Sequence, residues 1–432
     1  MNTTLNRYTR VVITGMGIVA PAARNVEEFQ TSLRAGTSGI LYWPEAAALG
    51  LSCQVAGTPK FEAASLDGLV PPPRRRTLSL SMEYAIVAAL ECWRDAGLPY
   101  DPEMRSAPDW DTGTSVGLAV GPIDVLTETV APLVAQQQHR QMGSRIAERS
   151  MTSGTAAAVS GILGLGGPTT TISSACCSGT AAIHQGIQTL RQGRCQRMLV
   201  GGVEIQSLHI AAIFDSMRVL SRQFNDHPER ASRPLSATAG GFVPAGGAGF
   251  LLLETIDSAR RRDARIHAEL AGSFENSGGQ RADGTMTQGN SQGGVRCIRG
   301  ALADAGVQPG EIDYVNGHLT ATQGDLKEIQ ILSEALGRGL KDMPRLNATK
   351  SLIGHTLGAA GAIESIATIL QLRDGFLHPS RNCEDLRQEF AELAPQIPTE
   401  PISFQFETAL KTSLGFGDVN SCLLFHRYGE SG

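Results

Sequence analysis

The sequence predicts an α/β fold in which short buried strands alternate with helices. Apolar runs such as SVGLAVG (115–121), RMLVGGVE (197–204) and FLLLET (250–255) are typical of buried strands. Segments with apolar residues three or four positions apart, typical of helices, separate these runs. The alternation resumes after residue 255, which favours two halves, 10–255 and 256–427, built on largely parallel sheets.

The first elements can be placed in order along the chain. A short strand is predicted at 11–14, with turns at the two glycines that follow it. NVEEFQTSLRAG (25–36) has helical spacing and a glycine stop at its end. PPPRRR (71–76) is predicted to be a loop that carries three arginines, and SMEYAIVAALECWRDAG (81–97) is predicted to be a helix.

Two adjacent cysteines, Cys176 and Cys177, lie between a predicted strand, TTTIS (169–173), and a predicted helix that begins near Thr180. Amide groups at the start of a helix carry partial positive charge, so a thiolate there would be stabilised and its pKa lowered. Gly179 would let a substrate approach closely. A buried structural cysteine explains the same pattern equally well.

In the second half, two of the nine histidines have unusual settings. His318 follows a predicted strand in EIDYVNGH, where loops of α/β proteins often carry chemistry. His355 precedes GAAGAIESIATILQL (358–372), a helix that is apolar almost all round and therefore buried. Burial would keep that imidazole neutral and able to donate one hydrogen bond. Lys350 and Glu364 flank it, although each histidine taken singly could be structural.

Composition excludes several classes of protein. The net charge of −5 disfavours nucleic acid as a partner, and no apolar run approaches the ~20 residues of a membrane helix. The start, MNTTLNRYTR, lacks the apolar core of a signal peptide. The eight cysteines show no C-x-x-C pair, so we expect neither a disulfide framework nor a metal site, and a reducing, cytoplasmic location.

Four ordered motifs connect these residues to a family. SSACCSG, VNGHLTAT, NATKSLIGHTLGAAGAIES and SLGFGDVNS together resemble the β-ketoacyl-acyl carrier protein synthases, closest to the elongating Cys-His-His type. RVVITGMGIVAP and SRPLSATAGGFVPAGGAG extend the resemblance over residues 10–427. It implies a thiolase-like fold with two similar halves in a layered α-β-α-β-α arrangement. It also implies an acyltransferase that condenses a Cys-bound acyl group with malonyl-acyl carrier protein, with loss of CO₂.

The resemblance assigns roles residue by residue. Cys176 matches the nucleophile, while Cys177 takes the position of a small packing residue. His318 and His355 match the family's two histidines, and Lys350 and Glu364 match its supporting charged residues. The other matched positions are Asp325 and Glu328 as supporting acids, Phe416 and the Cys176 amide as oxyanion donors at the acyl gate, and Val120 at the acyl pocket. Arg74, Arg75 and Arg76 fall where the family has basic residues for docking an acidic carrier protein, and Arg218 and Arg222 are further candidates for that role.

No cofactor is expected, because the acyl groups arrive on the phosphopantetheine of the carrier protein. Each of the arginines could equally be part of a solvated charge run, and Val120 could simply be a buried strand residue. A homodimer is the first expectation for the assembly, and the catalytic subunit of a heterodimer with a chain-length-setting paralogue is the alternative.

The chain departs from the family pattern at three places. Asp418 follows Gly417 where the family has a small residue, which would put a carboxylate beside the acyl gate. The family's GEGAG reads AGGAG at 245–249, with Gly247 at its centre, so an acidic residue is missing. The loop after His318 is about one residue short. These changes favour a specialised synthase of a polyketide, polyene or lipid-modifying pathway.

Two other readings fit the sequence less well. A non-catalytic partner subunit would usually lose the cysteine or a histidine, and this chain keeps Cys176, His318, His355 and Lys350. A thiolase would share the fold but use a second cysteine in a C-x-G motif near the C-terminus. Cys422, in NSCLLF, does not lie in such a motif.

Overall fold

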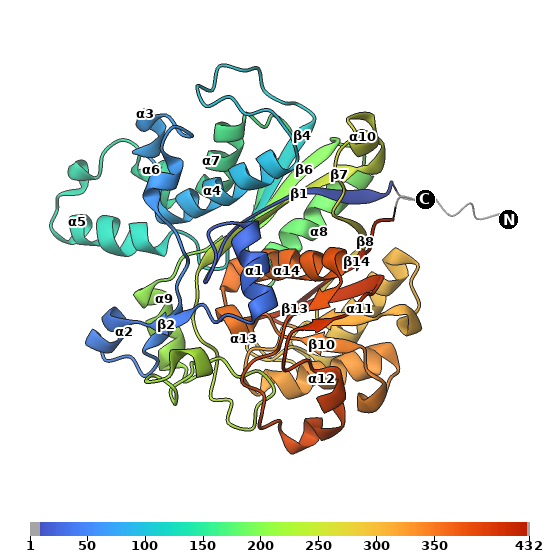
Figure 1. Cartoon of the computed structure of the whole chain (residues 1–432). Helices are drawn as coiled ribbons and strands as arrows, with labels where there is room; N and C mark the ends of the chain where they lie inside the picture. Colours follow the sequence, from blue (N-terminus) through green and yellow to red (C-terminus); the bar gives the residue numbers. More distant parts are fainter. Residues whose placement is uncertain (1–8, 430–432) are drawn as a thin grey trace.

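The main feature of the computed structural model, which describes residues 9–429, is one ten-stranded mixed sheet (Figure 1). Residues 1–8, on which the expectation about the amino-terminal segment partly rests, lie outside this range. The strand order is β10-β9-β13-β14-β8-β1-β7-β6-β4-β5. Only the short pairing of Val12 and Ile13 with Glu269 and Ala268 joins β1 to β8, so the sheet consists of two five-stranded halves.

The two halves repeat one topology. Counted along the chain, both have the order third, second, fourth, fifth, first strand. The first half contains β1 (Val11–Val19), β4 (Thr112–Gly117), β5 (Thr169–Ile172), β6 (Arg197–Glu204) and β7 (Gly247–Thr255). The second contains β8 (Ala268–Ser277), β9 (Tyr314–Asn316), β10 (Arg345–Asn347), β13 (Thr408–Gly415) and β14 (Val419–His426). Two-stranded ribbons are formed by β2 (Ile40–Tyr42) with β3 (Val55–Gly57), and by β11 (Phe376–Leu377) with β12 (Ile402–Ser403).

The expectation of largely parallel sheets is wrong in one respect. The second, third and fourth strands of each half are parallel, but the fifth strand is antiparallel to both of its neighbours. In the second half, only residues 416–418 separate β13 from β14. So short a connection can join only antiparallel strands, whereas parallel strands need a crossover of a dozen or more residues.

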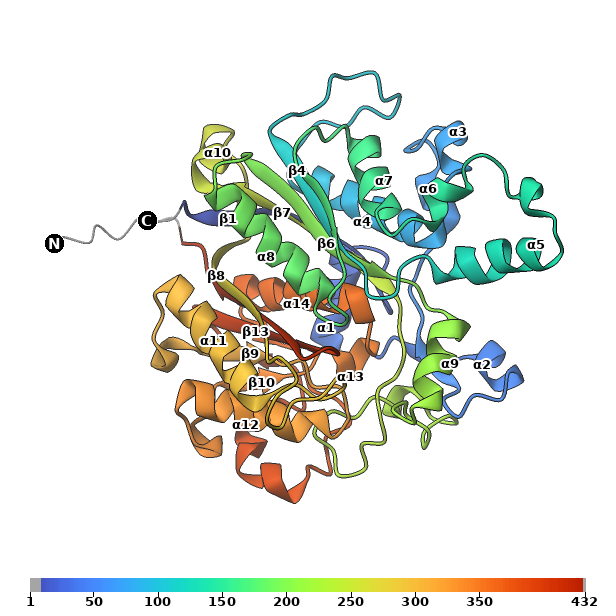
Figure 2. The ribbon, with the colours of Figure 1, turned by 180° about the vertical axis from the view of Figure 1, so that it is seen from behind.

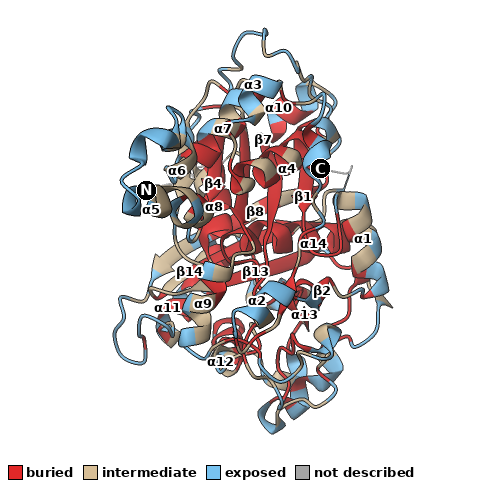
Figure 3. Cartoon of the chain, turned by 90° about the vertical axis from the view of Figure 1, so that its left-hand side faces the viewer, coloured by how far each residue is buried: buried red, intermediate tan, exposed pale blue. Residues whose placement is uncertain are grey.

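Helices complete the layered α-β-α-β-α arrangement (Figures 1 and 2). One outer layer, α4 and α7, covers the first half-sheet, while α11 and α12 form the outer layer of the second half. The middle layer, α8 and α14, is buried between the half-sheets (Figure 3). The helices are α1 (Val26–Ala35), α2 (Pro44–Ala48), α3 (Pro72–Arg75), α4 (Leu80–Asp95), α5 (Ala131–Ala135), α6 (Ile146–Ser150), α7 (Gly154–Leu163), α8 (Ser178–Arg191), α9 (Leu208–Ser216), α10 (Ile256–Arg261), α11 (Ser291–Ala305), α12 (Gly324–Leu336), α13 (Lys350–Ile353) and α14 (Ala360–Asp374).

Glycines in the first strand allow close packing rather than turns. The predicted turns at Gly15 and Gly17 are wrong, because β1 runs through both residues. A Cβ atom on Gly15 would lie 2.3 Å from the backbone oxygen of Cys92, and one on Gly17 would lie 2.0 Å from that of Ala88. Both oxygens belong to α4. The glycines therefore bring the outer helix against the sheet.

The crossing of the two middle helices corrects the role expected for Gly179. A Cβ on Gly179 would lie 2.9 Å from the oxygen of Gly358 and 3.0 Å from the nitrogen of Ala362. A Cβ on Gly361 would lie 2.5 Å from the backbone nitrogen of Thr180. Gly179 thus admits a neighbouring helix, not a substrate, and the close contact holds the start of α8 against the start of α14.

Three local predictions also need correction. The arginine-rich segment at 71–76 contains the short helix α3, which Pro72 begins at a favourable position. β4 ends at Gly117, so Val120 lies beyond the strand, and the residue is 40% exposed rather than buried. Helix α8 begins at Ser178, directly after the cysteines.

The absence of an acidic side chain from the AGGAG segment at 245–249 has a steric reason. Gly247 has φ +150°, a conformation that L side chains rarely adopt, and its Cβ would lie 2.6 Å from the oxygen of Val19. A Cβ on Gly246 would lie 2.5 Å from the nitrogen of Gln206. The start of β7 packs closely between β1 and the end of β6, so neither Gly246 nor Gly247 has space for a side chain.

Within residues 9–429, no helix is long and apolar enough to cross a lipid bilayer.

Candidate active site

The site lies where several strands end at the carboxyl edge of the sheet. Cys176 follows β5, His318 follows β9, and both Lys350 and His355 follow β10. Ala175 has a left-handed φ of +50°, which makes a sharp bend between β5 and α8. Cys177 is the N-cap residue of α8 and is fully buried, as expected for a packing residue, with its Sγ 3.3 Å from the oxygen of Val419.

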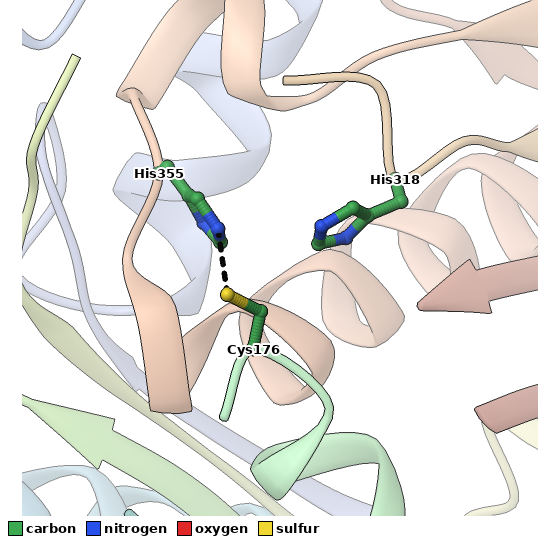
Figure 4. A group of neighbouring side chains, drawn as sticks. All are labelled: Cys176, His318 and His355. Atoms are coloured by element: carbon green, nitrogen blue, oxygen red, sulfur yellow. Dashed lines mark hydrogen bonds between the residues drawn. The ribbon is translucent and has the colours of Figure 1, made fainter. Parts of the chain in front are cut away.

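The side chains of Cys176, His318 and His355 converge from these three loops (Figure 4). One ligating atom from each lies within 4.8 Å of the other two. His355 Nε2 is 3.1 Å from Cys176 Sγ, and the two imidazole rings lie edge to face with centroids 5.3 Å apart. The structure therefore brings together the cysteine and both histidines that the sequence singled out.

Hydrogen bonds fix the same tautomer in both imidazoles. The backbone N–H of Leu357 donates to His355 Nδ1 at 3.3 Å. Lys350 Nζ donates to His318 Nδ1 at 3.4 Å. Because each Nδ1 acts as an acceptor, the ring proton of a neutral imidazole must be on Nε2. For His355 that N–H points to the sulfur of Cys176.

This tautomer also bears on metal binding. Nitrogen and sulfur donors at the spacing of Cys176, His318 and His355 could approach a zinc ion. A metal needs the nitrogen lone pair, however, and the two Nε2 atoms carry hydrogens. The arrangement suits donation of two hydrogen bonds to an oxygen or sulfur atom.

Burial sets the protonation state of the three groups. It lowers the pKa of His318 and of His355 well below the usual value, and the ammonium group of Lys350 lowers both further. Both imidazoles are therefore neutral, as expected. The same burial raises the pKa of Cys176 to about 12, against a smaller lowering by Lys350.

The expectation that the amides at the start of α8 lower the pKa of Cys176 is therefore wrong for the chain without substrate, because burial raises that pKa. Its sulfur faces the cavity while protein surrounds it elsewhere, and this burial disfavours the charged thiolate. The N–H of His355 is the group placed to stabilise the sulfur as negative charge forms.

Behind the imidazoles lies a buried ionic cluster of Lys350, Glu364 and Lys411. Lys350 Nζ is 2.5 Å from Glu364 Oε1, and Lys411 Nζ is 2.8 Å from Glu364 Oε2. All three side chains are at most 2% exposed. Lys350 and Glu364 were expected from the sequence, whereas Lys411 was missed. Its signal was a lysine in the otherwise apolar and small-residue strand TALKTSLG.

Two further carboxylates hold the backbone around His318. Glu328 accepts the N–H groups of His318 at 2.6 Å and Leu319 at 2.7 Å. Asp325 accepts the N–H groups of Thr320 at 2.8 Å and Leu235 at 2.9 Å, and burial raises its pKa to about 6. The two acids sit where supporting residues were expected, and they fix the shortened loop after His318.

A fourth buried acid near the site, Glu204, was missed because it ends a strand without any other signal. Its Oε2 accepts the N–H groups of Ala119 at 2.9 Å and Gly358 at 3.3 Å, and burial raises its pKa to about 7. Glu204 thereby ties the loop that carries Val120 to the segment that precedes α14.

A cavity of about 460 Å³ opens onto the three side chains. It is lined by all three and by Phe416, as expected for an acyl gate, and the Phe416 ring packs edge to face on Phe214. Val120, in the loop after β4, does not line this cavity. A pocket role for Val120 would have to involve another space.

The carboxylate of Asp418 points away from the acyl gate. It accepts the backbone N–H groups of Gln280 at 2.8 Å and Asn290 at 2.6 Å. Asp418 is fully buried and has φ +63°. It therefore joins the Phe416 loop to the loop at 278–290, whose residues 287–289 also line the cavity.

The five expected docking arginines differ in their surroundings. Arg75 is ion-paired with Asp67, whereas Arg74 and Arg76 are exposed. Arg218 is exposed and lines the cavity around Cys176, which connects it to the site. Arg222 is exposed and does not line that cavity.

Comparison with known proteins places this geometry in a family. Residues 8–259 match the model of the beta-ketoacyl synthase N-terminal domain, and residues 267–384 match that of its C-terminal domain. The chain is 33% identical over 419 residues to 3-oxoacyl-[acyl-carrier-protein] synthase 1 of Escherichia coli K12, covering 97% of this chain and 99% of that protein. It is 33% identical over 423 residues to the chloroplastic synthase I of Arabidopsis thaliana, covering 97% and 87%.

Solved structures agree with the sequence comparison. A beta-ketoacyl synthase from Burkholderia phymatum superposes with a TM-score of 0.87 at 31% identity, covering 98% of this chain and all of the other. The ishigamide ketosynthase/chain length factor has a TM-score of 0.87 at 28% identity, with the same coverage. From its sequence, its fold and the site that they form, the chain belongs to the β-ketoacyl synthase family.

Proposed function

We propose that the chain catalyses decarboxylative Claisen condensation between an acyl group on Cys176 and malonyl-acyl carrier protein, giving β-ketoacyl-acyl carrier protein. As a β-ketoacyl synthase it is an acyltransferase. One observation carries the assignment of roles: two neutral imidazoles direct their Nε2–H groups to the space beside a thiol, at the wall of a cavity. That arrangement stabilises a sulfur anion and an enolate oxygen in turn.

In the first half-reaction, Cys176 attacks the thioester of an acyl carrier protein. The thiol proton leaves as the carbon–sulfur bond forms, and the departing pantetheine thiolate takes up a proton. The tetrahedral oxyanion is stabilised by the backbone N–H groups of Cys176 and Phe416. Loss of one such donor typically costs ~10²–10³ in rate.

In the second half-reaction, the malonyl thioester loses CO₂ and leaves an enolate. His318 and His355 each donate an Nε2–H bond to the enolate oxygen, so no imidazole has to change its charge. The carbanion attacks the acyl carbonyl, and Cys176 leaves as a thiolate that is reprotonated. Lys350 acts through His318, which it orients from behind, while Glu364 holds Lys350.

The acyl groups travel on the phosphopantetheine of acyl carrier protein, and the reaction as written needs no other cofactor and no metal. We expect an acidic carrier protein to contact Arg74, Arg76, Arg218 and Arg222. Arg75 could contact it only by breaking its ion pair with Asp67. One similar solved structure is that of a type II polyketide acyl-carrier protein in complex with its ketosynthase. The likeness to that complex, with a TM-score of 0.85 at 28% identity, supports a carrier-protein partner.

Assembly and pathway are finer parts of the proposal. A homodimer in the cytoplasm comes first, with Val120 near the dimer contact and the two halves divided after residue 255. The alternative is the catalytic subunit of a ketosynthase/chain-length-factor heterodimer, and the structural likeness to one such pair supports keeping this alternative. Co-purification with a second, similar chain would decide between them. Both fatty-acid and polyketide or polyene synthesis fit the chemistry, whereas retention of Cys176, His318 and His355 argues against a non-catalytic subunit.

The test is intact mass spectrometry of the chain after incubation with acyl-carrier proteins of varied chain length, followed by malonyl-carrier protein. We expect the mass of one acyl group on the wild type and on Cys177→Ala, and none on Cys176→Ala. CO₂ release from malonyl-carrier protein should collapse in His318→Ala and His355→Ala. Loading that needs Cys177, or unchanged CO₂ release, would contradict the assigned roles.

A further inference from the structure

A lysine that no step above uses lies within the buried cluster. Lys411 is on β13, where it pairs in register with Asn316 of β9, two residues before His318. Its side chain is 0% exposed. A buried ammonium group is costly unless charged or polar partners compensate it. Lys411 has such partners in Glu364, at 2.8 Å, and Ser413 Oγ, at 3.2 Å.

Charges of both signs surround the two imidazoles. Glu364 touches both lysines, whereas Glu328 is held by backbone N–H groups and by the Thr412 hydroxyl at 2.7 Å. Two ammonium groups therefore balance these two nearest carboxylates. Among the described residues, the titratable groups that face the cluster are Tyr314 on β9, His318 after β9, Asp325 and Glu328 on α12, Lys350 on α13, His355 before α14, Glu364 on α14, His378 after β11, Cys176 and Cys177 before α8, Glu204 on β6 and Lys411 on β13.

Without Lys411 this balance would be lost. Lys350 would face Glu364 and Glu328 alone, leaving one excess negative charge behind the imidazoles. Negative charge favours imidazolium and opposes a thiolate or an enolate. In agreement, Lys411 contributes to lowering the pKa of both imidazoles, after burial and Lys350 for His355 and after burial, Lys350 and His355 for His318.

The loss would also affect geometry. Glu364 is shared, with one oxygen for each lysine. Without Lys411, the carboxylate could rotate toward other donors, and Lys350 would follow it away from His318 Nδ1. The 3.4 Å contact that fixes the tautomer of His318 therefore depends on both lysines.

We propose that Lys411 is a positioning residue for the condensation: its ammonium group holds Glu364 and balances the buried carboxylates, so that both imidazoles stay neutral Nε2–H donors. This inference rests on the proposed function. It predicts an effect on the acid limb of the pH–rate profile, which is the fall in condensation rate toward low pH. A protonated His318 could no longer accept a hydrogen bond from Lys350, and it would protonate the carbanion rather than stabilise it.

The experiment measures condensation as a function of pH for wild type, Lys411→Met and Lys411→Arg. For Lys411→Met we expect a rate at neutral pH lower on the order of tenfold, by analogy with the loss that follows removal of the partner that orients a metal-ligating histidine. Its acid limb should move to higher pH, because the imidazole pKa values rise. Lys411→Arg keeps the charge and should restore the position of the limb. Lys341→Met, at an exposed lysine paired with Glu392, is the matched control and should leave the profile unchanged.

A charge-balanced double variant covers loss of folding. If Lys411→Met alone does not fold, Lys411→Met/Glu364→Gln removes one charge of each sign and should fold with its acid limb near that of the wild type. A displaced limb or an unfolded chain in that variant overturns the inference. The inference is also overturned if the folded Lys411→Met variant keeps the acid limb of the wild type, or if its rate falls by the same factor at every pH. A wild type that does not condense at any pH would instead refute the proposed function.

Discussion

Replacing Glu364 with Gln should destabilise the fold strongly, because this one carboxylate neutralises two buried lysines. Its oxygens lie 2.5 Å and 2.8 Å from the ammonium groups of Lys350 and Lys411. Removing one partner of a buried ion pair typically costs ~3–5 kcal/mol, since it leaves an uncompensated buried charge. Here two charges lose the same partner, so we expect at least the upper end of that range, about 5 kcal/mol.

The penalty should depend on pH with a definite sign. Burial lowers the pKa of Lys350 even with Glu364 present, and loss of the carboxylate lowers it further. Between the folded and the unfolded pKa of the lysine, the unfolded chain binds a proton that the folded chain does not. Stability of Glu364→Gln should therefore rise with pH in this window. The loss of stability is complete below the pKa that Lys350 has in the folded variant, and it disappears above the pKa that the lysine has in the unfolded chain.

Urea denaturation of wild type and variant between pH 6 and 9.5, followed by circular dichroism, measures both effects. The matched control is Glu392→Gln, which breaks the exposed pair with Lys341 and should cost at most ~1 kcal/mol. A loss below about 1 kcal/mol for Glu364→Gln, or a pH slope equal to that of the wild type, would refute the reasoning about buried charge.

Three other predictions concern packing, the loop contact and the thiol. Gly361→Ala should destabilise by about 1–3 kcal/mol in urea denaturation, because its Cβ would lie 2.5 Å from the nitrogen of Thr180; an unchanged midpoint contradicts the close crossing. Asp418→Asn should cost about 1–3 kcal/mol and speed amide exchange at Gln280 and Asn290, and equal exchange rates would count against the loop contact. With a pKa of about 12, Cys176 should react with iodoacetamide ever faster from pH 7 to 10, whereas a plateau below pH 8 would contradict its burial.

The convergence of Cys176, His318 and His355 could be predicted from the sequence because each residue lies in a motif with its own local signal. A β-branched strand ends before Cys176, and an apolar helix follows His355, so strand ends and burial could be inferred without coordinates. The order of the motifs, which resembles that of a known family, then indicated which distant segments lie together in the fold. Periodicity could not have done so, since Cys176 and His355 are 179 residues apart.

The remaining site features depend on tertiary contacts that a linear pattern does not carry. Gly179 looked like space for a substrate, but a helix from the other half occupies it. Asp418 looked like a charge at the acyl gate, but its left-handed backbone turns it to the loop at 278–290. The pKa of Cys176 depends on burial by several segments, which outweighs the local field of one helix.

The central claim is that two neutral imidazoles present their Nε2–H groups beside Cys176. The most direct test is ¹⁵N NMR of the histidine-labelled wild-type chain at pH 7, with signals assigned through His318→Asn and His355→Asn. We predict that both residues show a protonated Nε2 and an unprotonated Nδ1. An imidazolium, or the Nδ1–H tautomer, at either position would contradict the account.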